Sequence, residues 1–179
     1  MSRRRLYIGL VTACAAVFLG LLIAYLHEHP PLLYYNQRIG WHELPTGLIR
    51  TAFRHISSKD LPPRADGLRA LFRGGREPEI FVRFKTNSEG IAYILDVFGA
   101  SAESETFDED KLQFMNTNRV GIFPTLSLVQ ESAGVILLNQ NSVKSGRTLT
   151  GCFNPPDGPG YRIFIEDPNS TLYISAGLN

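Results

Sequence analysis

Histidines and cysteines are the residues most able to carry chemistry in this chain. His27 and His29 form a His-Glu-His run. In an extended chain, side chains two positions apart share a face, so two imidazoles could hold a metal ion there. Zinc sites take three or four protein ligands, however, and no cysteine or further histidine lies near this pair in the sequence. We therefore interpret both as polar residues at a membrane interface and assign no metal ligand.

Cys152 is the cysteine that could act as a nucleophile, with His42 or His55 as its base. Neither histidine is close to Cys152 in the sequence, so the pairing would depend entirely on the fold. The chain has no Gly-x-Ser-x-Gly elbow and no phosphate-binding loop, because RGGRE is not followed by Gly-Lys-Ser/Thr. We assign no catalytic or cofactor-binding residue and expect no cofactor.

Two further patterns carry polar chemistry. An acidic run could attract a cation, but it lacks the spacing of a calcium loop and is better explained as the solvated start of a helix. Its members are Glu103, Glu105, Asp108, Glu109 and Asp110. Asn169 begins a formal glycosylation sequon, Asn-Ser-Thr, which matters only in a eukaryotic host.

The longest apolar stretch begins at Leu6 and ends at Leu26, and it contains no charged side chain. As a helix, residues 6–26 would span about 31 Å, close to the hydrocarbon thickness of a bilayer. A secretory signal is shorter and ends in an Ala-x-Ala-like site. A cut after Ala24 would place Leu22 where a small residue is required. We therefore predict a permanent transmembrane helix of the signal-anchor type.

Cys14 raises an alternative, because Val-Thr-Ala-Cys resembles the site of a lipid-modified cysteine. The apolar run before it is short, and apolar residues follow it where a polar tether is expected. We favour Cys14 as a small apolar residue of the membrane helix and keep lipidation as the alternative. In both cases the chain is tethered to the bilayer.

Basic residues set the expected orientation. Arg3, Arg4 and Arg5 precede the span, and no lysine or arginine follows it until Arg38. The positive-inside rule therefore places residues 1–5 in the cytoplasm and the C-terminal domain in the periplasm or outside the cell. We expect a single-pass protein of the inner (cytoplasmic) membrane.

Charge is unevenly divided along the rest of the chain. Residues 30–90 hold ten Lys/Arg and six Asp/Glu, whereas residues 91–179 hold five and ten. Basic residues spread over sixty positions do not form the tight cluster that binds lipid or nucleic acid, so we interpret the division as complementary faces of one domain. The formal net charge of +1 likewise favours no nucleic-acid partner.

The predicted organisation is a proline- and aromatic-rich stalk at residues 27–47, followed by one folded domain at residues 48–179. The domain has no internal disulfide if Cys14 lies in the membrane and Cys152 outside it. Residues 48–56 form a first strand or a short helix. Residues 67–73 and 80–85 predict an antiparallel pair of strands.

A helix is expected next, capped by Thr86 and Glu89, with an apolar face and Gly99 at its end. Further helices are expected from residue 108 and at residues 124–134, and residues 134–140 could be strand or helix. Residues 147–153 predict a strand, and residues 161–166 and 171–177 predict a C-terminal hairpin. The expected fold is α+β, an antiparallel sheet with helices packed on one face.

The segments LPPRADGLRALF, IFVRFKTNSEGIAYIL and YRIFIEDPNSTLYIS resemble parts of small bacterial membrane-tethered or lipoprotein-like proteins. The resemblance implies an extracytoplasmic α+β domain and no known activity.

The predicted function is a membrane-anchored extracytoplasmic binding or accessory domain without catalysis, with the bilayer and an envelope protein as partners. One alternative is an envelope hydrolase that uses Cys152 or a metal near His27 and His29. Another is an immunity or assembly factor for a membrane partner.

Overall fold

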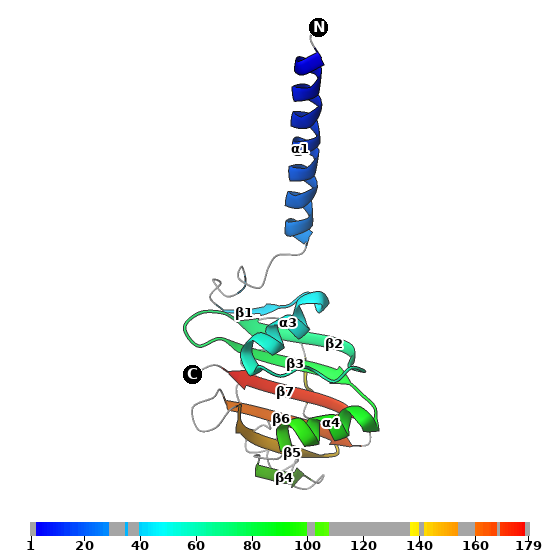
Figure 1. The fold of residues 1–179 in the computed structure, drawn as a ribbon. Helices are drawn as coiled ribbons and strands as arrows, with labels where there is room; N and C mark the ends of the chain where they lie inside the picture. Colours follow the sequence, from blue (N-terminus) through cyan, green and yellow to red (C-terminus); the bar gives the residue numbers. More distant parts are fainter. Residues whose placement is uncertain are drawn as a thin grey trace.

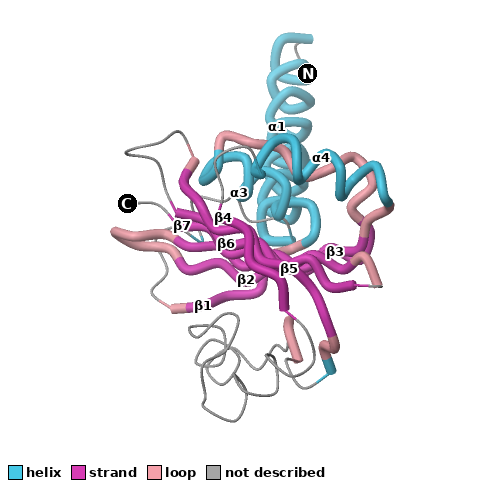
Figure 2. The backbone as a smooth tube through the Cα atoms, turned by 90° about the horizontal axis from the view of Figure 1, so that it is seen from below, coloured by secondary structure: helices cyan, strands magenta, loops and turns pink. Residues whose placement is uncertain are grey.

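The computed structural model describes residues 3–28, 35, 40–99, 103–107, 137–139, 142–153, 160–167 and 169–177. These residues form a long N-terminal helix and a seven-stranded antiparallel sheet with helices on one of its faces (Figures 1 and 2). The expected α+β fold class is confirmed.

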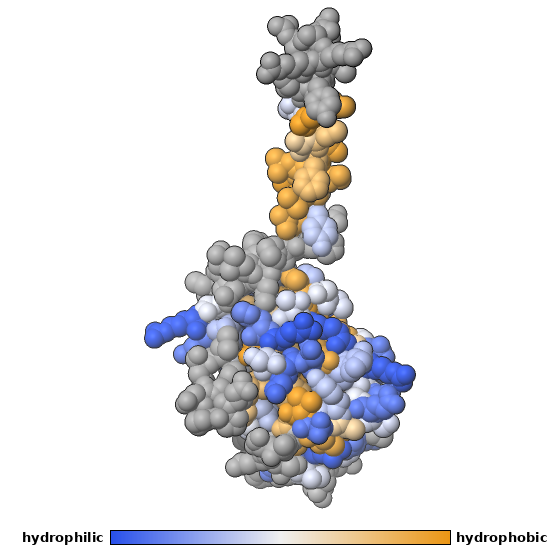
Figure 3. Space-filling model, viewed as in Figure 1, coloured by the Kyte–Doolittle hydropathy of each residue, from blue (hydrophilic) through white to orange (hydrophobic). Residues whose placement is uncertain are grey.

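Helix α1 (Arg3–Glu28) is 26 residues long. At about 1.5 Å per residue its length is near 39 Å. Its window Gly9–Leu26 is long and apolar enough to cross a membrane, and none of that window is buried against the rest of the protein. Figure 3 shows the coloured segment of this helix as largely apolar and standing clear of the domain.

The strands lie in the order β1-β2-β3-β7-β6-β5-β4, and every neighbouring pair is antiparallel. Their bounds are β1 Trp41–Glu43, β2 Asp66–Arg73, β3 Glu79–Lys85, β4 Glu103–Phe107, β5 Ser145–Cys152, β6 Gly160–Asp167 and β7 Thr171–Gly177. The two predicted hairpins, β2–β3 and β6–β7, are confirmed. They join through β3 and β7, so the C-terminal strand lies at the centre of the sheet.

Helix α3 (Thr46–Ser57) covers strands β2, β3 and β7. The sequence left residues 48–56 open between strand and helix. A helix forms because Ile49, Ala52, Phe53 and Ile56 recur with helical spacing and are all buried. Ser58 ends the helix in the left-handed conformation, and its N–H donates to the carbonyl of Arg54.

Helix α4 (Ser88–Gly99) is present as predicted, but its cap differs from the expected one. The side-chain oxygen of Asn87 accepts the N–H of Gly90 at 3.0 Å, so Asn87 caps the helix. The expected cap by Thr86 is wrong, because the N–H of Thr86 donates to the carbonyl of Ser170 and continues the sheet pairing. The helix therefore begins two residues after Thr86.

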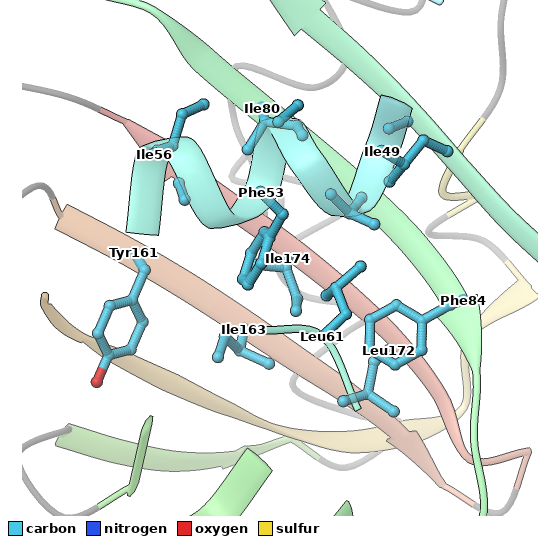
Figure 4. Close-up of a cluster of buried hydrophobic side chains, with 14 of the residues drawn as sticks. Ile49, Phe53, Ile56, Leu61, Ile80, Phe84, Tyr161, Ile163, Leu172 and Ile174 are labelled. Carbon is cyan, nitrogen blue, oxygen red and sulfur yellow. The ribbon is translucent and has the colours of Figure 1, made fainter. Parts of the chain in front are cut away.

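The core lies between the helices and the sheet. Side chains of α3 point toward strands β3, β7 and β6, as Figure 4 shows for Phe53 among Ile80, Ile174 and Ile163. Next to them, rings from α3, α4, β6 and residue 153 form an aromatic cluster with edge-to-face and tilted contacts. Its members are Phe53, Phe98, Phe153 and Tyr161.

The folded domain also includes residues that the sequence analysis placed in the stalk. Strand β1 pairs with β2, and both Leu44 and Tyr35 are buried members of the core cluster. Strand β4 was not expected either, since residues 103–107 are rich in acidic side chains. The helices expected from residue 108 and at 124–134 lie outside the described residues, whereas the strand expected at 147–153 is present as β5.

Candidate functional site

The face of the sheet opposite α3 and α4, here called the second face, carries the polar groups that could form a site. Strand alternation directs every other residue of β2, β3, β6 and β7 to this face. Its apolar members include Leu71, Phe81 and Phe164, all of them buried. Polar side chains buried among them therefore need hydrogen-bond partners.

The clearest polar group on this face, here called the Tyr173 cluster, comprises Arg83, Glu166, Asn169 and Tyr173. The hydroxyl of Tyr173 donates to Oε2 of Glu166 at 3.1 Å, and Nδ2 of Asn169 donates to Oε1 at 3.0 Å. Glu166 is only 7% exposed. Both oxygens of the buried carboxyl group thus have hydrogen-bond donors, as buried polar atoms require.

Electrostatics keep Tyr173 in its protonated form. Burial raises the pKa of the Tyr173 phenol, the charge of Glu166 raises it further, and a hydrogen bond and charge from Arg83 oppose the shift. Arg83 lies directly opposite Tyr173 in the β3–β7 pair. Tyr173 is therefore a hydrogen-bond donor held between a carboxylate and a guanidinium.

Two other polar atoms on the second face are buried without a hydrogen-bond partner in the described part of the chain: Nε of Arg83 and Oγ1 of Thr148. They belong to one cross-strand row, in which Arg83 faces Tyr173, Tyr173 faces Phe164 and Phe164 faces Thr148. Three strand intervals of about 4.8 Å place the two ends of the row some 14 Å apart. The row thus offers hydrogen-bond donors at both ends of an aromatic strip.

The structure does not bring Cys152 and the histidines together. His42 lies on β1 and Cys152 on β5, five strand intervals apart, or about 24 Å. His55 lies on α3 over the opposite face, and Cys152 is an exposed free thiol at the end of its strand. The Cys-His pair required by the hydrolase alternative is therefore not formed by these residues.

Among the described residues no group of three or more His, Cys, Asp or Glu side chains could hold a metal ion. His29 and the side chain of His27 lie outside the described part of the chain, as do Asp108, Glu109 and Asp110. Asn169 is exposed in the β6–β7 turn, but its amide already bonds Glu166. Glycosylation there would leave Nδ2 of Asn169 a single N–H to donate to Glu166.

Sequence reasoning missed the Tyr173 cluster, although a signal for it was present. Arg83 is a charged residue inside the otherwise apolar strand run IFVRF, and Glu166 follows the apolar residues Ile163, Phe164 and Ile165. A charge within a predicted central strand needs a buried partner. What the sequence did not show is that β3 and β7, ninety residues apart, would be neighbours.

The fold therefore defines a class: an antiparallel α+β domain that follows one candidate membrane span, counted over the described part of the chain. Comparison of the chain with protein-family models, curated proteins and solved structures gave no match in any of the three.

Proposed function

We propose that this protein is a single-pass inner-membrane protein that presents an extracytoplasmic binding domain without catalytic activity. The observation that carries the proposal is that α1 is apolar along Gly9–Leu26 and wholly exposed. The domain has a closed core without α1. Exposing so much apolar surface to water is costly, at roughly 25 cal/mol per Å², and a bilayer removes that cost.

The proposed orientation rests on charge. Arg3, Arg4 and Arg5 precede the span, and nothing basic follows it until Arg38. This distribution retains the N-terminus in the cytoplasm and exports the domain.

The proposal of binding without catalysis rests on the state of the polar groups. Glu166 is already bonded by Tyr173 and Asn169, so its carboxylate is not a free base. Cys152 lies about 24 Å from His42, and a nucleophile needs its base within hydrogen-bond distance. We expect the partner to be a protein of the cell envelope.

Protease accessibility tests the topology. On intact cells whose outer layer alone is permeable, added protease is expected to digest the domain, while inverted inner-membrane vesicles protect it. The opposite pattern would overturn the assignment of compartment. Release of the full chain from membranes by alkaline carbonate would overturn the anchor itself.

Cross-linking in intact cells tests the binding role, because it traps a partner without requiring purification of a weak complex. Enrichment of one envelope protein, lost when the domain is unfolded by mutation of its core, is the expected result. Thermal shifts after alkylation of Cys152 and after metal chelation test the hydrolase alternative. A large metal-dependent shift would contradict the proposal.

A further inference from the structure

The connection between the membrane helix and the domain is shorter than the sequence implies. Helix α1 ends at Glu28, and Tyr35 is already a buried member of the domain core, 8% exposed. Only residues 29–34 lie between these two points. Seven Cα–Cα steps span at most about 25 Å even when fully extended. The side of the domain where the chain enters is therefore held near the bilayer.

The chain enters the sheet at Trp41, the first residue of β1 and the only tryptophan of the protein. Trp41 pairs with Arg73 at the end of β2, whose guanidinium lies 5.3 Å from the centre of the indole ring and forms an ion pair with Glu79 at 3.1 Å. The indole also packs on Phe81 of β3, with ring centroids 5.0 Å apart, and stays partly exposed. Indole and arginine both combine an apolar body with a polar end, which suits the headgroup layer of a membrane. In Figure 1, β1 is the strand of the sheet nearest to α1.

Because of the strand order, the basic first half and the acidic second half of the sequence also lie at opposite ends of the sheet. Residues 40–85, which build β1, α3, β2 and β3, hold nine Lys/Arg and five Asp/Glu, a net charge of +4. Strands β4, β5 and β6 at the other end of the sheet hold four acidic and two basic residues. The basic residues are thus gathered in the half of the domain that the tether holds close to the membrane.

We propose that the β1 edge of the domain, with Trp41 at its centre and the exposed side chain of Arg76 beside it, docks on anionic phospholipid headgroups of the leaflet at which α1 leaves the membrane. This proposal rests on the membrane anchorage proposed above. The short tether keeps the edge within reach, and the anionic surface orients the +4 half toward the lipid and the acidic half away from it.

Trp41 reports on this docking directly, because no other tryptophan contributes to the fluorescence. The full chain is reconstituted in vesicles of phosphatidylcholine alone or with about 30% phosphatidylglycerol, a fraction that gives a strongly negative surface. A trace of lipid with a nitroxide on its headgroup is the quencher. We expect quenching of Trp41 in the anionic vesicles that high salt reverses, because salt screens exposed charges.

Matched variants test the geometry. Arg76→Gln removes one exposed charge from the β2–β3 hairpin next to Trp41, and Lys144→Gln removes one exposed charge before β5. Near an anionic surface, one basic side chain changes the ratio of docked to undocked domain about fivefold. We expect that loss for Arg76→Gln and no change for Lys144→Gln. Insertion of about eight Gly/Ser residues after His29 lengthens the tether without touching the core and should weaken docking.

Other results would overturn the proposal. Equal headgroup quenching in neutral and anionic vesicles, or an equal loss in both charge variants, would exclude electrostatic docking of this edge. If quenching of Trp41 by the headgroup nitroxide decreases as the protein-to-lipid ratio rises, the β1 edge binds a second copy of the chain instead of lipid. Failure of the chain to float with vesicles after carbonate treatment would refute the anchor as well, whereas flotation without quenching would refute the docking alone.

Discussion

Single residues on the second face show how the domain holds charge in its interior. Glu166 is buried, and its two carboxylate oxygens are each bonded by a side chain, Tyr173 and Asn169. Removing a donor from a buried carboxylate costs more than removing an exposed hydrogen bond, because the oxygen left behind has no water to replace the donor. The Tyr173 cluster is therefore sensitive to the loss of single atoms.

Tyr173→Phe should lower the free energy of unfolding by about 1–2 kcal/mol, since Oε2 of Glu166 loses its donor. Tyr93→Phe is the matched control, because its hydroxyl donates to the carbonyl of Asp60 at an exposed position. We expect a cost below about 1 kcal/mol there. Urea unfolding of the full chain in detergent micelles measures both, and an equal loss in the two variants would contradict the assigned role of Tyr173.

Glu79 introduces a dependence of stability on pH. Burial raises the pKa of Glu79 above 4.5, the charge of Arg73 opposes the shift and that of Glu77 adds to it. Because the folded protein binds this proton more tightly than the unfolded chain, the contribution of Glu79 is present below pH 4.5 and is lost as the pH rises through the folded pKa.

Glu79→Gln removes this titration, so its stability relative to the unchanged protein should improve between about pH 4 and pH 7. Melting temperatures at the two pH values measure the effect. Asp96→Asn, an exposed change on α4 away from this hairpin, is the control. A relative stability of Glu79→Gln that falls with rising pH would show that the ion pair with Arg73 outweighs burial.

Individual helices and strands were predictable where their signals are local. The hairpins β2–β3 and β6–β7 follow from short β-rich runs separated by turn residues, and the face of α4 follows from its spacing. The short edge strands β1 and β4 were missed, because three to five residues carry little pattern and their pairing is supplied by the neighbouring strand. The cap of α4 was predicted one residue too early. The N–H of Thr86 bonds the carbonyl of Ser170 in the distant β6–β7 turn, a contact that the local sequence does not show.

The cap of α4 gives a sharp test. Asn87→Ala should cost about 1 kcal/mol of stability, because the N–H of Gly90 loses its acceptor. Thr86→Val should be close to neutral, since the hydroxyl of Thr86 is buried without a hydrogen-bond partner among the described residues. Thermal unfolding of the two variants decides the matter. A larger loss for Thr86→Val would restore Thr86 as the cap.

A substitution at Gly146 of β5 tests how closely β5 packs against β6. A methyl group there would meet the ring of Phe164 and lie 2.5 Å from the carbonyl oxygen of Ile165. Gly146→Ala should therefore cost about 1–3 kcal/mol. At Gly160 of β6 the nearest atom would be 4.0 Å away, so Gly160→Ala should fold normally. Equal denaturation midpoints for the two variants would contradict this close packing of β5 against β6.

At the scale of the whole molecule, the order of the strands decides which residues meet, and local sequence signals do not contain it. Arg83 and Tyr173 come together only because β7 inserts beside β3. The start of the domain was likewise placed at Leu48, although Tyr35, Leu44 and β1 complete the core and the sheet. Both features depend on contacts between segments far apart in the chain.

Two truncations locate the start of the domain. A chain that begins at Tyr35 should leave the membrane fraction yet unfold with an unchanged midpoint, because the span buries nothing against the domain. A chain that begins at Leu48 should lose about 3 kcal/mol or more, since two buried side chains and a strand are removed. Urea titration followed by circular dichroism measures both. Equal midpoints would show that residues 35–47 are dispensable.

The central position of β7 has a consequence for how the protein is made. Residues 171–177 are synthesised after the other six strands of the sheet, yet they join the β2–β3 hairpin to the β5–β6 pair. Pairing of such distant segments is slow, because a long loop must close before any contact compensates for its entropy. The two halves of the sheet must therefore wait, with their inner strands uncovered, until residues 171–177 have been synthesised. The candidate membrane span, α1, is therefore synthesised long before the sheet can be completed.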